Sequence, residues 1–344
     1  MKIVFVLPTV HRTGGVRATI IVGNRLLARG HRVRIVYRRD RITLKGLYHR
    51  VFFPVLFPKS HEWLHTFDGE SSNFLDISEC YFDEDEIIIG AGMWASSQLC
   101  KLEGSPNIKL QYLHGEHIVD TNETIKVLKS GLPKIAVASF LSPLAESVGS
   151  RILEVVPNGV DTTEYFESVG SYQKDGLGAI YASHIAKDPE TLLAVYKRLS
   201  AMYADVPWRI FSAHRRPRGI PKEYFWRLPS VSKARELYSK SFAWIVASKS
   251  EGFGMPILEA MACGCAVVAT DCGGPRDIIK DGKNGFLVEV GNVKQIVDRV
   301  LLLLNDSDLR EKICREGRRT VETFSWDRTV NRLEKVLERL AYAG

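Results

Sequence analysis

Long apolar runs are absent from this 344-residue chain, and none approaches the roughly 18 residues that a membrane-spanning helix needs. The opening run KIVFVLP (2–8) is short and is followed by His11 and Arg12, with no small-residue cleavage site. We therefore expect no signal peptide and a cytoplasmic protein. The hydrophobic content of 45% and charged content of 25% are typical of a soluble globular chain. A chain of this length is expected to form two domains.

Cysteine is scarce, and its spacing fits no zinc template. Of the six cysteines, Cys263, Cys265 and Cys272 lie closest together, and we expect them to fill a helix-to-strand junction. The run HEWLH (61–65) does match the zinc-protease pattern. Pro58 before it and FDGESSN after it leave little room for the helix that this pattern requires, so we do not interpret it as a metal site.

Acidic residues are almost missing from the first 61 positions, which hold 13 Lys or Arg and a single acid, Asp40. Residues 62–86 reverse the balance, with nine Asp or Glu and no Lys or Arg. A basic block of this kind favours a polyanionic partner such as a phospholipid, a nucleic acid or a diphosphate-linked substrate. The alternative is a solvated basic face beside a compensating acidic one.

Strand-like and helix-like segments alternate along the chain in two runs. The first contains strands within 2–8, 31–39, 86–92, 108–115, 134–140 and 151–159, and the second within 177–183, 208–214, 242–248, 265–271 and 285–290. A polar stretch (162–176) separates the runs, and an amphipathic helix (326–342) follows them. This order predicts two doubly wound α/β domains, 1–160 and 161–325, with the last segment (326–344) packing back on the first.

The stretch SEGFGMPILEAM (250–261) places two glutamates, Glu251 and Glu259, around a turn-prone run. The loop follows a predicted strand, so it lies at the carboxyl edge of a parallel sheet, where ligands bind. Pro256 suits the first turn of a helix, whose free amides form a site for phosphate. Gly252 and Gly254 let the backbone approach an anion, and a carboxylate can accept bonds from paired sugar hydroxyls. The order of these groups matches hexose, pyrophosphate and ribose.

These residues resemble a known family. EGFGMPILE (251–259) is similar to the E-x₇-E motif of retaining GT-B glycosyltransferases, particularly family 4. VVPNGVD (155–161), KDPETLL (187–193), GCAVVATDCGGPRDIIKDGKNGFLV (264–288) and FSW (324–326) resemble further motifs of the family in the same order. Residues 155–342 carry most of the resemblance. It implies a GT-B fold, with two Rossmann-like domains facing each other across a cleft: an N-terminal acceptor domain and a C-terminal nucleotide-sugar donor domain.

The resemblance also implies roles for individual residues. Glu251 would contact the donor sugar near the reacting carbon, Glu259 would bind the ribose hydroxyls, and Lys187 would neutralise the departing pyrophosphate. The implied donor-binding run is Gly252, Phe253, Gly254, Met255, Pro256, Ile257, Leu258 and Glu259. Backbone groups near Ser212, Arg227 and Leu228 would hold the nucleobase. The family requires no cofactor and no metal.

One departure concerns the segment YASHIAKDP (181–189). The family usually has an arginine a few residues before the lysine, whereas this chain has Ser183 and His184. Either His184 supplies part of the phosphate contact, or an arginine from AHRRPR (213–218) reaches in, or donor binding is weak.

The first domain resembles the family less closely. Gly14 and Gly15 precede a helix whose N-terminus can face a phosphate, although they do not form the dinucleotide G-x-G-x-x-G pattern. His114 follows a strand in LHGEH and is the best positional match for the family's catalytic histidine, with Glu116 and His117 nearby. An isolated histidine is also compatible with a purely structural role.

The aromatic and basic stretch 44–64 is compatible with peripheral membrane contact on the cytoplasmic face, or with a buried strand and a loop. We therefore expect a polysaccharide-type hexosyltransferase that uses a nucleoside-diphosphate sugar, acts on a glycan, lipid-linked or small-molecule acceptor, retains configuration and binds no nucleic acid. The alternatives are a sugar-nucleotide epimerase and a catalytically silent GT-B binding subunit.

Overall fold

The computed structural model describes residues 1–11, 13–39, 63–102, 105, 107–115, 121–167 and 174–343. The chain divides into two compact units, and we describe each by itself. Unit 1 comprises Met1–Pro157 and Trp326–Gly344, and unit 2 comprises Asn158–Ser325. No helix among the described residues is long and apolar enough to cross a membrane.

Unit 1 is built on a parallel sheet. Within the described residues its strands are β1 (Lys2–Leu7), β2 (Arg32–Arg38), β3 (Glu70–Phe74), β4 (Glu86–Ala91), β5 (Lys109–Leu113), β6 (Lys134–Ala136) and β7 (Glu154–Val155). Their order is β3-β2-β1-β4-β5-β6-β7, so the strand order reverses between β1 and β4. This is the doubly wound arrangement.

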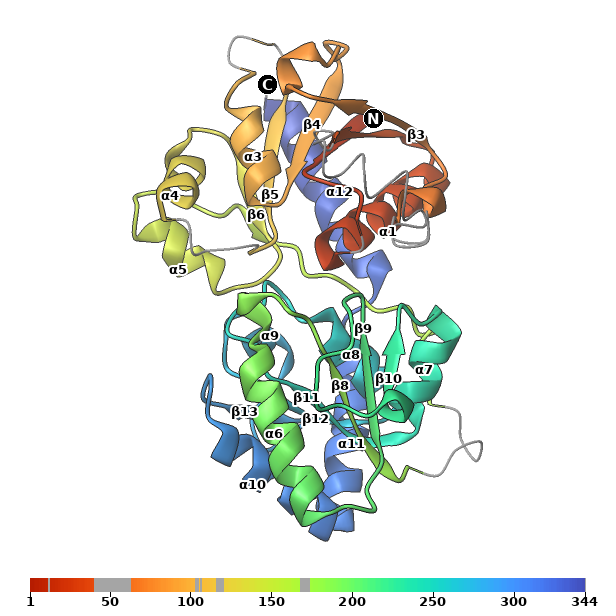
Figure 1. The fold of residues 1–344 in the computed structure, drawn as a ribbon. Helices are drawn as coiled ribbons and strands as arrows, with labels where there is room; N and C mark the ends of the chain where they lie inside the picture. The colour runs from red at the N-terminus through yellow and green to blue at the C-terminus, as the bar shows by residue number, and fades with distance from the viewer. Residues whose placement is uncertain are drawn as a thin grey trace. The chain divides into compact units, whose positions relative to one another are not determined.

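The helices of unit 1 are α1 (Gly14–Ala28), α3 (Met93–Leu99), α4 (Thr121–Lys129), α5 (Leu141–Glu146) and the C-terminal α12 (Trp326–Ala343). Helix α12 packs against α1 (Figure 1). Arg25 pairs with Asp327 at 3.0 Å, and Glu334 accepts from His31 at 2.9 Å and from Arg29. The end of the chain therefore belongs to the N-terminal unit.

Unit 2 repeats the doubly wound order. Its strands are β8 (Gly176–Ile180), β9 (Trp208–Ser212), β10 (Phe225–Arg227), β11 (Ser241–Val246), β12 (Ala266–Thr270) and β13 (Phe286–Val288). Its helices are α6 (Pro189–Met202), α7 (Val231–Ser239), α8 (Met255–Ala262), α9 (Pro275–Ile278), α10 (Val293–Asn305) and α11 (Ser307–Val321). All pairs in the order β10-β9-β8-β11-β12-β13 are parallel, and the reversal falls between β8 and β11.

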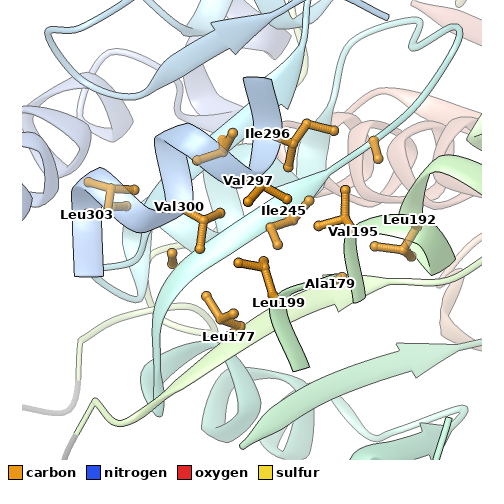
Figure 2. Close-up of a cluster of buried hydrophobic side chains, with 14 of the residues drawn as sticks. Leu177, Ala179, Leu192, Val195, Leu199, Ile245, Ile296, Val297, Val300 and Leu303 are labelled. Carbon is orange, nitrogen blue, oxygen red and sulfur yellow. The ribbon is translucent and has the colours of Figure 1, made fainter. Parts of the chain in front are cut away.

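The core of unit 2 explains why its sheet is rigid at the edge that carries the loops. Helices α6 and α10 contact each other and cover one face, while α7, α8 and α11 contact strands β11 and β12. Figure 2 shows the apolar side chains on one face, which are Leu177, Ala179, Leu192, Val195, Leu199, Ile245, Ile296, Val297, Val300 and Leu303. Every one of them is at most 3% exposed, so the loops at the strand ends start from fixed positions.

The predicted class of two doubly wound α/β units is confirmed, but strands β3 and β10 were not predicted. Strand β3 has only Phe74 buried, and β10 is three residues long with no fully buried residue. Both are edge strands, and edge strands need no apolar alternation. Helix α1 also starts earlier than expected: Gly14 and Gly15 are its first residues, and Thr13 is the N-cap.

The charge asymmetry of the sequence is partly neutralised within unit 1. Lys2 pairs with Asp83 at 3.2 Å and with Asp85 at 2.9 Å, and Arg34 pairs with the buried Glu86 at 2.6 Å. These contacts join the basic block to the acidic stretch that follows it, which is the compensating arrangement considered above. Residues 40–62, which include most of the aromatic stretch 44–64, lie outside the described residues.

Candidate functional site

Two predicted site residues meet at the reversal point of the unit 2 sheet. Lys187 ends the short 3₁₀ helix η5 (Ile185–Lys187) after β8, and Glu251 lies in the loop after β11. Their side chains form an ion pair, with 2.6 Å between Lys187 Nζ and Glu251 Oε1. The carboxyl ends of strands on either side of a reversal point are where doubly wound folds bind ligands.

Glu251 is held on several sides. The hydroxyl of Ser248 donates to its Oε1 at 2.8 Å, and its backbone bridges to the loop after β12, with Gly274 N donating to Glu251 O at 2.9 Å. The residue is only 8% exposed, whereas 40% of the Lys187 side chain is exposed. The carboxylate is therefore fixed, and the ammonium group keeps access to solvent.

Helix α8 begins directly after this loop. Gly254 is its N-cap at φ +105°, a conformation that favours glycine, and no side chain caps the first amides. The backbone of Phe253 lies very close to Gly274. A β-carbon added at Gly274 would lie 2.3 Å from the Cα atom of Phe253. In the first turn Pro256 has no N–H, and Ile257 N donates to Gly254 O at 2.8 Å. The backbone N–H that the helix start can offer to a ligand is therefore that of Met255, in a loop held by close backbone packing.

Glu259 lies one turn into α8 and is buried, at 8% exposed. The hydroxyl of Tyr238 donates to its Oε2 at 3.0 Å. Burial, followed by the charge of Glu259, raises the pKa of Tyr238 well above its usual value, so the phenol keeps the proton that it donates. Between the two glutamates, Ile257 and Leu258 are fully buried, so their side chains belong to the core and only their backbone can face a ligand.

The predicted nucleobase region forms a second group at the same edge. Ser212 and Arg227 are register partners at the ends of β9 and β10, and Leu228, at φ +49°, donates its N–H to Ser212 O at 2.8 Å. His184 caps η5, its Nδ1 accepting from Ala186 N at 3.2 Å. His214 lies 2.9 Å from the Ser183 hydroxyl through its Nδ1.

Sequence reasoning missed Ser248, Tyr238 and His214 as members of this site. Ser248 lies three residues before Glu251 in the same loop. Tyr238 reaches Glu259 from helix α7, so no spacing pattern connects these two residues. His214 lies within the arginine-containing segment 213–218. The one feature of the sequence that could have pointed to His214 is the position of this segment at the end of a predicted strand.

The predicted residues of unit 1 lie at the carboxyl edge of its own sheet. Gly14 and Gly15 open α1, where Thr13 Oγ1 accepts from Val16 N at 3.3 Å. His114 follows β5 and is 7% exposed, with Tyr112 edge-on at 4.5 Å. Burial lowers its pKa to about 4, and its Nε2 has no hydrogen-bond partner among the described residues. Glu116 and His117 lie outside the described residues.

The residues described by the structure contain no cluster of three or more His, Cys, Asp or Glu side chains suited to a metal. Of the HEWLH run, His61 and Glu62 lie outside these residues, and His65 lies in a single 3₁₀ turn, Leu64–Thr66. Cys263 and Cys265 are buried, and burial raises the pKa of Cys263 to about 12, so both stay thiols.

A family model matches part of unit 2, and curated relatives match the same region or more. The family model described as glycosyl transferases group 1 matches residues 218–320. An uncharacterized glycosyltransferase of Methanocaldococcus jannaschii is 40% identical over 97 residues, which cover 28% of each chain. A phosphatidyl-myo-inositol mannosyltransferase of Mycobacterium leprae is 34% identical over 212 residues, covering 58% of this chain and 56% of that protein. The chain thus spans less than two thirds of the length of these relatives.

Solved structures agree over the whole chain. Anabaena Alr3699/HepE in complex with UDP and glucose has a TM-score of 0.75 at 16% identity, covering 98% of this chain and 99% of that one. Sucrose-phosphate synthase from Thermosynechococcus elongatus has a TM-score of 0.71 at 14% identity, covering 100% of both chains. At this identity the likeness shows the fold, and the two doubly wound units are those of the GT-B fold.

Proposed function

We propose that the chain is a metal-independent, retaining glycosyltransferase of the family 4 type that transfers a hexose from a nucleoside-diphosphate sugar to an acceptor hydroxyl. The observation that carries the proposal is the 2.6 Å pair of Lys187 and Glu251 at the reversal point of the unit 2 sheet. A glycosyltransferase needs a cation for the leaving diphosphate and an acceptor of hydrogen bonds for the sugar at adjacent positions, and this pair supplies both.

In this proposal, groups of unit 2 contact successive parts of the donor. The backbone N–H of Met255 at the start of α8 and the ammonium group of Lys187 bind the diphosphate, and Lys187 stabilises the charge that develops as the diphosphate departs. Glu251 accepts hydrogen bonds from the hexose. Glu259, oriented by Tyr238, accepts from the ribose hydroxyls. The roles of Gly14, Gly15 and His114 stay predictions.

Retention is proposed without a protein nucleophile. The departing phosphate oxygen would take the proton of the acceptor hydroxyl on the same face of the sugar. Two features of the site support this route. Glu251 is already bonded to Lys187 and Ser248, and burial raises the pKa of the neighbouring Cys272 to about 11, which keeps it a thiol near neutral pH. Neither group is thus prepared for covalent attack.

The proposed donor and acceptor classes are inferred from related proteins. Alr3699/HepE has been solved with UDP-glucose, and phosphatidyl-myo-inositol mannosyltransferases are named for a lipid acceptor and a mannosyl group. We propose a nucleotide-sugar donor and a glycan or lipid-linked acceptor met at the cytoplasmic surface of a membrane. Neither nucleic acid nor a cofactor is part of the proposal.

The first experiment measures release of the nucleoside diphosphate from UDP-glucose, GDP-mannose and ADP-glucose, with and without EDTA, in the presence of a mixed glycan and lipid acceptor extract. One donor should be consumed, with no effect of EDTA. We expect Lys187→Met and Glu251→Gln each to lower kcat by about 100-fold or more, since each removes a group that acts in the transition state. Lys294→Met, which changes an exposed lysine paired with Asp298, should leave the rate unchanged.

The products separate the rival functions. A sugar-nucleotide epimerase would interconvert the donor sugar without an acceptor, and a silent binding subunit would bind a donor but release nothing. An NMR spectrum of the product reports the anomeric configuration, and inversion would contradict the proposed mechanism. Equal activity of Lys187→Met and Lys294→Met would show that the pair of Lys187 and Glu251 takes no part in the reaction, and the proposal would lose its main support.

A further inference from the structure

His214 lies among cationic side chains. It starts the loop after β9, where its backbone N–H donates to Ser212 Oγ at 2.8 Å and its Nδ1 lies 2.9 Å from Ser183 Oγ. The residue is exposed, so its ring can meet a ligand. These two contacts hold the imidazole beside the segment that leads to Lys187.

The charges around His214 are cationic. Partial desolvation, then His184 at the N-cap of η5 and Arg227 of β10, lower the pKa of His214 below the ordinary value. Within the part of the chain that the structure describes, no carboxylate is among the causes of this shift. The other charged groups of its own loop, Arg215, Arg216 and Arg218, are also cations.

The carboxylates at the same edge of the sheet are occupied. Glu251 is paired with Lys187, and Asp188 is bonded to the Thr191 hydroxyl at 2.7 Å and lies 3.5 Å from Lys249 Nζ. A cluster of cations without a free counter-charge is an anion-binding site.

The two histidines differ in what their hydrogen bonds permit. Nδ1 of His184 accepts from Ala186 N, so a proton on that nitrogen would break the cap of η5. The partner of His214 Nδ1 is a hydroxyl, which can either donate to a neutral ring or accept from a charged one. His214 can therefore gain a proton without losing its position, whereas His184 cannot.

We propose that His214 binds the diphosphate of the nucleotide sugar in its protonated form, so that donor binding takes up a proton and is tighter at mildly acid pH. The inference rests on the proposed function and identifies the residue that supplies the cationic contact beside Lys187. It also means that the donor affinity of this chain responds to pH.

The direction of this pH dependence follows from the linkage between proton binding and donor binding. In the free protein, partial desolvation and then the surrounding cations keep His214 largely neutral near pH 7, because its pKa lies below the ordinary 6.5. A bound dianion reverses that field and raises the pKa, so the complex holds more protons than the free protein. Affinity then rises as pH falls towards the pKa of the free protein. The diphosphate of an intact nucleotide sugar has no site that gains a proton in this range, so the dependence belongs to the protein.

The experiment measures the Kd of UDP-glucose, GDP-mannose and ADP-glucose by calorimetry at about pH 6 and about pH 8. We expect the preferred sugar to bind wild type roughly fivefold tighter at the lower pH. His214→Gln should bind with the same affinity at both, close to the weaker wild-type value. His214→Arg, with a permanent charge, should bind with the same affinity at both but more tightly than His214→Gln. His31→Gln, which changes the histidine paired with Glu334, should keep the wild-type dependence.

Proton uptake provides a second readout. Calorimetry in buffers of different ionisation enthalpy should show protons entering on binding to wild type, and fewer entering with His214→Gln. Binding with the same affinity at both pH values, or a dependence that His214→Gln retains, would overturn this inference and leave the proposed function standing. Failure of all three sugars to bind at either pH would overturn both.

Discussion

The candidate site residues of the two doubly wound units differ in how their buried polar groups are bonded. In unit 2, Glu251 is paired with Lys187 and Ser248, and Glu259 accepts from Tyr238. In unit 1, the imidazole of His114 is buried with Nε2 lacking a partner among the described residues. Unit 2 thus holds its candidate site with hydrogen bonds to side chains. In unit 1 the ring of His114 packs edge-on against Tyr112, and its Nε2 is left without a hydrogen-bond partner among the described residues.

This difference has a physical consequence. A polar group with partners keeps its orientation before a ligand arrives, which is the preorganisation that lets it act on developing charge. A buried group without a partner carries a desolvation cost that a ligand or a neighbouring segment can relieve. The two candidate sites should therefore respond differently to mutation and to pH, and three experiments test this.

The largest effect is expected at Gly274 of unit 2. In Gly274→Ala the new β-carbon would lie 2.3–2.6 Å from three backbone atoms of Phe253, so one of the two loops has to move. Because Gly274 N also donates to Glu251 O, the movement displaces the carboxylate. We expect unit 2 to lose about 3 kcal/mol of stability, measured by urea denaturation, and donor affinity to fall.

Gly131→Ala in unit 1 is the matched control, because a β-carbon at Gly131 meets no atom within 4 Å. It should change stability by no more than about 0.5 kcal/mol. A similar cost for the two substitutions would show that the loop of unit 2 is not held as closely as its backbone contacts indicate.

In both units the buried strands could be predicted from the sequence. Strands β8, β9, β11, β12 and β13 of unit 2 were recognisable because buried parallel strands are continuous apolar runs, whereas β10, with no fully buried residue, was not. Glu251 and Glu259 were recognisable because a strand, a glycine loop and a helix start at Pro256 determine their positions. Strand β3 was not recognisable, since its sequence, ESSNF, buries only the last residue.

Contacts between elements could not be predicted. Two partners of the glutamates come from other elements, Lys187 from η5 and Tyr238 from α7, and only the lysine was implied, through a family resemblance. Hydrogen bonds of this kind depend on packing that no local spacing encodes. The same limit applies to His214, whose importance comes from Ser183 and Arg227 beside it.

The second effect concerns His114 and acid pH. Its folded-state pKa of about 4 lies below the ordinary 6.5, so the unfolded chain binds the proton first. The contribution of neutral His114 to stability is complete above pH 6.5 and is lost progressively as pH falls towards about 4. Between about pH 8 and pH 5, we expect unit 1 to lose about 2 kcal/mol more in wild type than in His114→Gln.

Hydrogen exchange of the β5 amides measures this difference within unit 1, because wild type and variant share the same intrinsic exchange rates at each pH. His31→Gln serves as the control, since it changes another histidine of unit 1, one that is paired with Glu334. Parallel profiles of wild type and His114→Gln would mean that the imidazole becomes charged inside the fold, and the contrast between the units would be lost.

The smallest effect compares two buried tyrosines. Tyr238 of unit 2 donates to the Glu259 carboxylate at 3.0 Å, and Tyr112 of unit 1 donates to the carbonyl of Val156 at 2.6 Å. Hydrogen bonds to charged groups contribute more than those to neutral ones, so Tyr238→Phe should cost about 1 kcal/mol more than Tyr112→Phe in urea denaturation. Tyr238→Phe should also weaken nucleotide binding, because Glu259 loses the donor that orients it, whereas Tyr112→Phe should not. Equal costs, with the nucleotide affinity unchanged in both variants, would place the Glu259 carboxylate outside the preorganised site and leave Lys187 and Glu251 as its only fixed pair.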